Sequence, residues 1–191
     1  GTLAYVLESL HEAGVVYTGS DDGFVHITKD NGESWQNITP KNLGESLVNA
    51  IEVSPHDKAT VYIATTQYKF NDHTPAIYKS TDYGKTWVGI NSGIPMGAFT
   101  RVVREDPLRK DLLYAGTEKG LYLSWNGGKS RKPFQLNLPK APITDIKIHD
   151  GDLIVATSGR AFWILDDLRV LSEYDATQKG IKLYQPNDAM N

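Results

Sequence analysis

The chain contains no cysteine among its 191 residues. This absence excludes a disulfide, a thiolate nucleophile and a cysteine-ligated metal. No apolar run approaches the roughly 18 residues that a membrane-spanning helix needs, and the first residues lack the basic segment that opens a signal peptide. We therefore expect no membrane insertion, and any signal peptide lies upstream or has been removed.

The sequence also lacks an excess of charge of one sign. Lys and Arg number 20 against 23 Asp and Glu, which leaves a net charge of −3 and gives no general reason to expect binding to nucleic acid. Hydrophobic residues make up 40% of the chain and charged residues 23%, a balance typical of a folded soluble protein. The length suits one domain or part of a larger one.

A short motif recurs along the chain. Thr28-Lys-Asp-Asn-Gly-Glu-Ser-Trp35 returns as Ser80-Thr-Asp-Tyr-Gly-Lys-Thr-Trp87, and a weaker copy follows at Ser124-Trp-Asn-Gly-Gly-Lys-Ser130. The surroundings repeat as well, with β-rich runs such as Val61-Tyr-Ile-Ala64. A fourth repeat keeps its strand-like runs, among them Ala161-Phe-Trp-Ile-Leu165, but has lost the motif. The chain therefore consists of four repeats of one structural unit.

Each repeat predicts four short strands, rich in Val, Ile and Tyr and separated by Asp-Gly or Pro turns. Four strands in about 40–50 residues are typical of a β-propeller blade. We predict an all-β chain of four consecutive four-stranded blades that form part of a larger propeller. The blades are expected at residues 1–46, 47–98, 99–142 and 143–174, followed by an exit segment at 175–191.

The motif has the chemistry of a tight turn between the third and fourth strands. Glycine supplies a positive φ without steric cost, and aspartate accepts hydrogen bonds from backbone N–H groups in the turn. The Trp that follows is expected to return apolar surface to the core. In the third repeat Asn replaces Asp and Arg131 replaces Trp, so we expect that turn to be less well held. The structural residues so assigned are Asp30, Gly32, Trp35, Asp82, Gly84, Trp87, Asn126 and Gly128.

These octets resemble the Asp-box, or bacterial neuraminidase repeat, of sialidases, sortilin-type receptors, xyloglucan-degrading glycosidases and photosystem assembly factors. The wider chain resembles the last four blades of sortilin-like bacterial propellers, which are often named glycosyl hydrolases. The resemblance implies a propeller that is extracellular or periplasmic, and specifies function weakly because the same blades serve enzymes, receptors and scaffolds. Besides the octets, the features that carry it are Ser54-Pro-His-Asp57, Arg104-Glu-Asp-Pro107, Gly116-Thr-Glu-Lys-Gly-Leu-Tyr122 and Gly159-Arg-Ala-Phe-Trp-Ile-Leu-Asp-Asp-Leu168.

Ligands of propellers usually bind the face that carries the loops between second and third strands. In the second repeat this loop, residues 66–75, is longer than in the first, and such an insertion often carries recognition groups. Its Tyr68, Phe70, Asp72 and His73 suit sugar or peptide binding, although a solvated hairpin explains them as well. Arg160 is expected on the same face, either at a ligand or in an ion pair with a neighbouring blade.

Three functions remain open at this stage. The first is a binding or scaffold module that takes a peptide, glycan or protein partner on its loop face. The second is part of a sialidase-like or xyloglucanase-like glycoside hydrolase, with catalytic carboxylates partly outside this segment. The third is a purely structural domain. On the loop face, Asp21, Asp22, Asp72 and Glu118 lie on different blades, and no catalytic residue can be named.

The sequence predicts no metal and no cofactor. The five histidines are scattered, and His11 and His56 occupy equivalent positions, which favours a repeated turn role. An arc of four blades would expose the apolar flanks of the first and last blades. We therefore expect further propeller blades, from the same polypeptide or from another chain, as partners.

Overall fold

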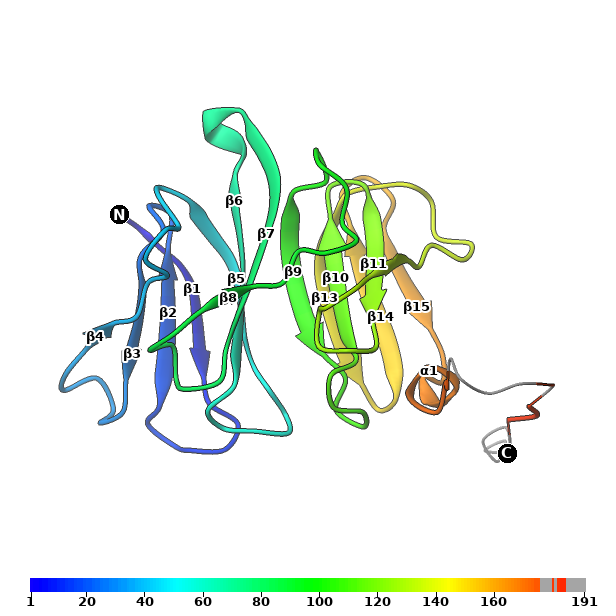
Figure 1. The fold of residues 1–191 in the computed structure, drawn as a ribbon, viewed down its shortest axis with the longest axis horizontal. Coiled ribbons are helices and arrows are strands. Elements are labelled where there is room, and N and C mark those ends of the chain that lie inside the picture. Colours follow the sequence, from blue (N-terminus) through cyan, green and yellow to red (C-terminus); the bar gives the residue numbers. More distant parts are fainter. Residues whose placement is uncertain (176–179, 181, 185–191) are drawn as a thin grey trace.

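The structure is a computed structural model of the chain, and it describes residues 1–175, 180 and 182–184. It consists of four antiparallel sheets that follow one another along the sequence (Figure 1). Within each sheet the strands are hydrogen-bonded in chain order. The predicted all-β succession of four blades is confirmed, and we call the sheets blades 1 to 4.

The first three blades have four strands each. Blade 1 comprises β1 (Leu3–Glu8), β2 (Val16–Ser20), β3 (Val25–Thr28) and β4 (Gln36–Asn37). Blade 2 comprises β5 (Leu47–Val53), β6 (Val61–Gln67), the 3₁₀ turn η1 (Tyr68–Phe70), β7 (Asp72–Ser80) and β8 (Val88–Gly89). Blade 3 comprises β9 (Thr100–Glu105), β10 (Leu113–Thr117), β11 (Gly120–Ser124) and β12 (Lys132–Pro133).

Blade 4 differs from the prediction, because its described residues form three strands and not four. They are β13 (Ile143–His149), β14 (Asp152–Thr157) and β15 (Phe162–Leu165). After β15 the chain enters the short helix α1 (Arg169–Ser172). Asp167, just before this helix, has a φ of 58°, and its carboxylate accepts from the Arg169 guanidinium at 2.8 Å. Most of the predicted exit segment 175–191 lies outside the described residues.

Neighbouring blades approach closely where the second strand carries glycine. A Cβ on Gly116 of β10 would lie 2.6 Å from Cγ2 of Ile143 in the next blade, and Gly19 of β2 faces Val48 in the same way. Only glycine allows such an approach. The buried side chains form two apolar clusters, one within blades 1 and 2 and one that runs from blade 2 to blade 4.

The outer flanks of blades 1 and 4 are uncovered. Phe162 of β15 is 76% exposed, whereas its equivalents in blades 1 to 3 are at most 3% exposed: Val25, Ile77 and Leu121. Val6 of β1 is 58% exposed, whereas its equivalents in blades 2 to 4 are at most 1% exposed: Ile51, Val103 and Ile146. Side chains that blades use to pack on one another are therefore exposed at both ends of the arc. In the described part of the chain, no helix is long and apolar enough to cross a membrane.

Candidate functional site

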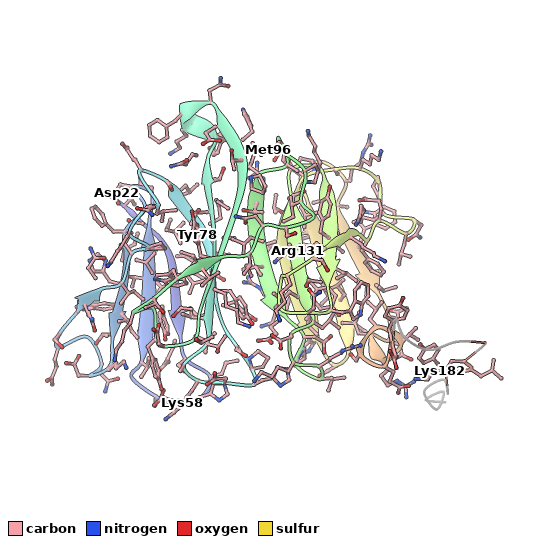
Figure 2. All side chains as sticks on the ribbon, in the orientation of Figure 1. Asp22, Lys58, Tyr78, Met96, Arg131 and Lys182 are labelled. Carbon is pink, nitrogen blue, oxygen red and sulfur yellow. The ribbon has the colours of Figure 1, made fainter. Side chains whose placement is uncertain are left out.

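The hairpin of β6, η1 and β7 lies at one end of the blades and contacts blade 3. Most of the loop predicted at residues 66–75 belongs to its strands, and we call this extended hairpin end the long loop. η1 lies at the top of Figure 1, and Figure 2 labels Asp22 and Met96 at this end and Lys58 at the other. The ring of Tyr68 stacks on that of Phe99 with centroids 5.6 Å apart and planes 16° apart. The ring of His73 meets the same phenylalanine at 5.5 Å. Phe99 precedes β9, so the loop of blade 2 is packed on the entry to blade 3.

An ion pair of blade 3 extends this contact. The guanidinium carbon of Arg101 lies 5.1 Å from the centroid of Phe99, a cation–π geometry. Nε and Nη2 of Arg101 both lie 2.8 Å from Oε2 of Glu118 in the β10–β11 loop. We call Tyr68, His73, Phe99, Arg101 and Glu118 the junction cluster.

Hydrogen bonds hold the base of the long loop on both sides. Nε2 of Gln67 donates to the carbonyl oxygens of Leu43 and Glu45, which precede β5. The hydroxyl of Thr100 in β9 accepts from the N–H of Ala76 at 3.1 Å and donates to its carbonyl at 2.9 Å. The loop is therefore fixed at its stem, and its tip presents Phe70, 56% exposed, to solvent.

The structure brings some of the predicted ligand residues together and leaves others apart. Tyr68 and His73 meet on Phe99, and Phe70 ends the same 3₁₀ turn as Tyr68. Asp72 binds the N–H of Thr74 in its own hairpin at 2.9 Å. Arg160 is exposed in the β14–β15 loop of blade 4, outside the junction cluster. No ion pair of its side chain is found within the described residues, so of its two expected roles the ion pair with a neighbouring blade is not seen there.

Sequence reasoning missed Phe99 and did not recognise Arg101 as part of this site. Both follow the connection from β8 to β9, one of the loops between blades that share the ligand face of propellers. An aromatic residue followed two positions later by arginine in such a connection was the available signal. The inserted loop was visible because it was longer than its counterpart, whereas this connection has no unusual length.

The carboxylates of the loop face already have hydrogen-bond or ionic partners. Asp21 accepts from the N–H of Thr2, and Asp22 accepts from the Ser20 hydroxyl. Hydrogen bonds from Ser20 and Thr74 lower the pKa of Asp22 and Asp72 respectively. These two carboxyls are ionised at neutral pH, and neither has the raised pKa that a general acid needs.

The repeated turns lie at the opposite end of the blades. In the first, Oδ1 of Asp30 accepts from the Thr28 hydroxyl at 2.7 Å and from the Ser34 N–H at 2.9 Å. The Ser34 hydroxyl also donates to Oδ2 at 2.5 Å, and this hydrogen bond, followed by those from Thr28 and the Ser34 N–H, lowers the pKa of Asp30 to about 2. The second turn repeats the pattern around Asp82, with the Thr86 N–H at 2.9 Å.

The third turn corrects an expectation. Asn126 accepts from the Ser124 hydroxyl and the Ser130 N–H, both at 3.0 Å, and its amide also donates to the Ser130 hydroxyl. It therefore has the hydrogen bonds of the first two turns, and the expected weakening is wrong in this respect. An amide oxygen accepts in the same geometry as a carboxylate oxygen.

The residue after each turn bonds to the preceding blade. Nε1 of Trp87 donates to the carbonyl of Ile38 at 2.6 Å, and Nη1 of Arg131 donates to the equivalent carbonyl of Ile90. Trp35, in contrast, is 46% exposed. The prediction that this indole lies in the core is wrong, because no described part of the chain covers its side of blade 1.

A charged group joins the inner strands of all four blades. Arg104 of β9 binds the hydroxyl of Tyr5, Oε2 of Glu52 at 3.5 Å and Oδ1 of Asp145 at 2.9 Å, and its Nε donates to the carbonyl of Ile146. These side chains line a hollow of about 360 Å³. Burial raises the pKa of Glu52 to about 7, against the opposing effect of the guanidinium. Such a weak ion pair does not offset the desolvation of the carboxylate.

The two equivalent histidines link successive blades. Nε2 of His11 lies 2.8 Å from the carbonyl oxygen of Ser54, and Nε2 of His56 lies 2.7 Å from that of Asp106. Both are thus engaged in hydrogen bonds between blades. Among the described residues, no three or more His, Cys, Asp or Glu side chains lie together in a group that could hold a metal ion.

The arrangement of the four sheets is similar to that in several solved structures. YCF48 bound to D1 peptide matches with a TM-score of 0.64 and 15% identity over 86% of this chain and 52% of that one. A GH74 enzyme from Niastella koreensis matches with a TM-score of 0.66 and 20% identity over 87% of this chain and 28% of that one. The chain shares the β-propeller fold.

The likeness is one of fold alone at these identities. A GH74 xyloglucanase from Xanthomonas campestris gives a TM-score of 0.64 at 17% identity, over 87% of this chain and 29% of that one. The chain therefore spans about half the length of YCF48 and less than a third of the two enzymes. No protein-family model and no curated protein matches it.

Proposed function

We propose that the chain is part of a β-propeller that binds an extended ligand, a peptide or a glycan, at the junction of blades 2 and 3. The observation that carries this proposal is the junction cluster, in which a long loop of one blade is packed on aromatic and charged side chains of the next. Such a site has a fixed stem and an apolar tip, which suits recognition without a large ordering cost.

The exposed side chains supply the chemistry of binding. Tyr68 and Phe70 are 40% and 56% exposed, and Met96 nearby is 72% exposed. Aromatic surfaces of this kind take sugar rings or apolar peptide side chains, while His73 and the Arg101–Glu118 pair offer donors and acceptors. The structurally similar YCF48 was solved with a peptide bound, which supports the peptide alternative.

The same proposal requires further blades. The exposed Val6 and Phe162 flanks correspond to surfaces that pack blade on blade elsewhere in this chain. We therefore propose that blades of the same polypeptide or of another chain cover them. An extracellular or periplasmic location, as for a secreted Asp-box protein of the sortilin-like kind, belongs to this proposal as well.

Glycoside hydrolysis is the second candidate, supported by the fold shared with two GH74 enzymes. It would need a proton donor on the loop face, and the carboxyls of Asp22 and Asp72 have lowered pKa values. Its second carboxylate would have to come from outside this segment. The binding function is therefore the better supported of the two.

Two sets of ligands test the proposal: peptides selected on the full chain from a display library, and a panel of xyloglucan oligosaccharides. Titration calorimetry measures the binding of each to the full chain. Phe70→Ser should weaken binding of the selected ligand about tenfold, as loss of one stacked aromatic does. Phe24→Ser is the matched control, because Phe24 is 48% exposed and follows the β2–β3 loop of blade 1. Equal effects of the two substitutions, or none from Phe70→Ser, would contradict the proposed site.

A further inference from the structure

Blade 4 has an open edge where the other blades have their outermost strand. In blades 1 to 3 this strand has two residues, which pair with the third strand in one shared register. The pairs are His26↔Asn37 and Ile27↔Gln36, Tyr78↔Gly89 and Lys79↔Val88, and Tyr122↔Pro133 and Leu123↔Lys132. The corresponding residues of β15 are Trp163 and Ile164, and no described strand pairs with them.

The residue after each outer strand makes one further hydrogen bond of constant geometry. The N–H of Ile38 donates to the carbonyl of Val25 at 2.8 Å, and the same bond joins Ile90 to Ile77 at 2.9 Å and Phe134 to Leu121 at 2.8 Å. The register of the second and third strands makes Phe162 the equivalent acceptor in blade 4. A fourth strand in blade 4 would thus be followed by a residue whose N–H donates to the carbonyl of Phe162.

The open edge is apolar as well as unpaired. Ile164 of β15 is 62% exposed, while its counterpart Leu123 in blade 3 is fully buried. A shallow groove of about 40 Å³ separates β15 from the segment after β12. It is lined by Phe134, Leu136, Leu138, Trp163 and Leu165, among others. Exposed strand edges of this kind readily accept another strand.

One segment of the chain has the sequence of an outer strand. Blade 1 has Trp35-Gln-Asn-Ile-Thr-Pro40 and blade 3 has Arg131-Lys-Pro-Phe-Gln135. The C-terminal part reads Ile181-Lys-Leu-Tyr-Gln-Pro186. In this alignment Lys182 and Leu183 take the two paired positions, and Tyr184 takes the place of Ile38.

We propose that Lys182 and Leu183 form the fourth strand of blade 4 by adding to β15. In this arrangement Lys182 is opposite Ile164, Leu183 is opposite Trp163, and the N–H of Tyr184 donates to the carbonyl of Phe162. In the structure Lys182 and Leu183 are not paired with β15. Leu183 is 92% exposed there, and the Lys182 ammonium lies 3.5 Å from a carboxylate oxygen of Glu173.

The chain is long enough for this addition. Lys182 is ten positions after Ser172 at the end of α1, and ten steps of extended chain span up to about 33 Å. Paired strands are only about 4.8 Å apart. The Glu173 contact already holds Lys182 near α1, which follows the end of β15 where an antiparallel fourth strand would begin.

The proposed strand also gives Tyr184 a defined place. In blades 1 and 2 the equivalent Ile38 and Ile90 pack against the turn glycines of the following blade, Gly84 and Gly128. Tyr184 would lie on the flank of blade 4 where a following blade packs. Lys182, Leu183 and Tyr184 would then belong to blade 4 and not to an exit from it.

Cysteine cross-linking in the full chain tests this register, since the natural sequence has no cysteine. Opposed residues in antiparallel strands have Cα atoms about 4.5–5.5 Å apart, within the range that a disulfide bridges. Under mild oxidation, Ile164→Cys with Lys182→Cys should form an intramolecular disulfide at least tenfold faster than Ile164→Cys with Leu183→Cys. In the second pair the new side chain points to the other face of the sheet.

Mass spectrometry and non-reducing electrophoresis distinguish the outcomes, and hydrogen exchange of the Tyr184 amide in the natural chain provides a second measurement. Faster linkage of the first pair together with a protected Tyr184 amide supports the proposal. Equal rates for both pairs, linkage mainly between two molecules, or an unprotected amide would overturn it. Linkage mainly between two molecules would mean that a strand from another copy of the chain pairs with β15. None of these results depends on the ligand site at the junction of blades 2 and 3.

Discussion

Trp87 and Trp35 occupy the same position in their repeats, and the structure predicts opposite consequences for replacing them. In Trp87→Phe, the hydrogen bond from Nε1 to the Ile38 carbonyl is lost and a partly buried acceptor is left without its donor. A lost hydrogen bond costs about 0.5–1.5 kcal/mol, and a fully buried unpaired group about 1–3 kcal/mol. Since this indole is only half-buried, we expect a loss of about 1–2 kcal/mol in the free energy of unfolding.

Trp35→Phe should change the free energy of unfolding by less than about 0.5 kcal/mol, as for an ordinary surface substitution. Its indole is 46% exposed, and a Cβ on the turn glycine beside it, Gly32, would meet only Trp35 itself. For a chain of this length 1 kcal/mol corresponds to about 2–4 °C in Tm. The Trp87 variant should therefore melt about 2–8 °C below the natural chain, and the Trp35 variant within about 2 °C of it.

Urea unfolding followed by circular dichroism, with calorimetry for Tm, measures both variants. The two substitutions remove the same atoms, so the difference between them reports the surroundings of Trp87, its hydrogen bond to Ile38 included. Equal losses in the two variants, or a larger loss in Trp35→Phe, would refute the reasoning. In a propeller completed by a preceding blade, Trp35→Phe should become as costly as Trp87→Phe.

Three further predictions concern the hollow beside Arg104 and the turns. In the natural chain the free energy of unfolding should fall by about 3 kcal/mol between pH 4.5 and 7, and in Glu52→Gln this fall should be absent. Urea titrations across that pH range measure both. The raised pKa of Glu52, about 7, means that the fold favours the protonated form and loses stability as the pH rises through this window. Arg104→Met should cost about 3 kcal/mol because a buried carboxylate loses its cation, and adding Glu52→Gln should recover part of the loss. Gly84→Ala should lower Tm more than Gly159→Ala: both have φ near +80°, but only at Gly84 would the Cβ meet a neighbour, 2.5 Å from Cδ1 of Ile38.

The fold could be predicted because the repeat carries local information. Gly32 and Gly84 have φ values of 92° and 83°, as tight turns require. Asp30 and Asp82 bind atoms within four positions of themselves, so their contacts depend little on the rest of the chain. Hydrogen bonds of this range follow from sequence spacing alone.

The site was only partly predictable because its contacts cross between blades. The long loop and its aromatic residues were visible as an insertion. Their partner Phe99 is about thirty positions further on and became apparent only when blade 3 was packed beside blade 2. Sequence also gave no sign that Asn126 would maintain the third turn as well as aspartate does in the others.

The sequence by itself determined the number of blades, the turns that connect their outer strands and the absence of cysteine chemistry, because these depend on residue type and short spacing. Tertiary structure alone decided which equivalent residues are buried. Trp35 and Trp87 have the same local sequence but different surroundings, since burial depends on which blade lies alongside. The charge state of Glu52 was decided in the same way, by the burial of its carboxylate beside a guanidinium from the next blade. Contacts between residues far apart in the chain are set by packing, and local sequence does not encode them.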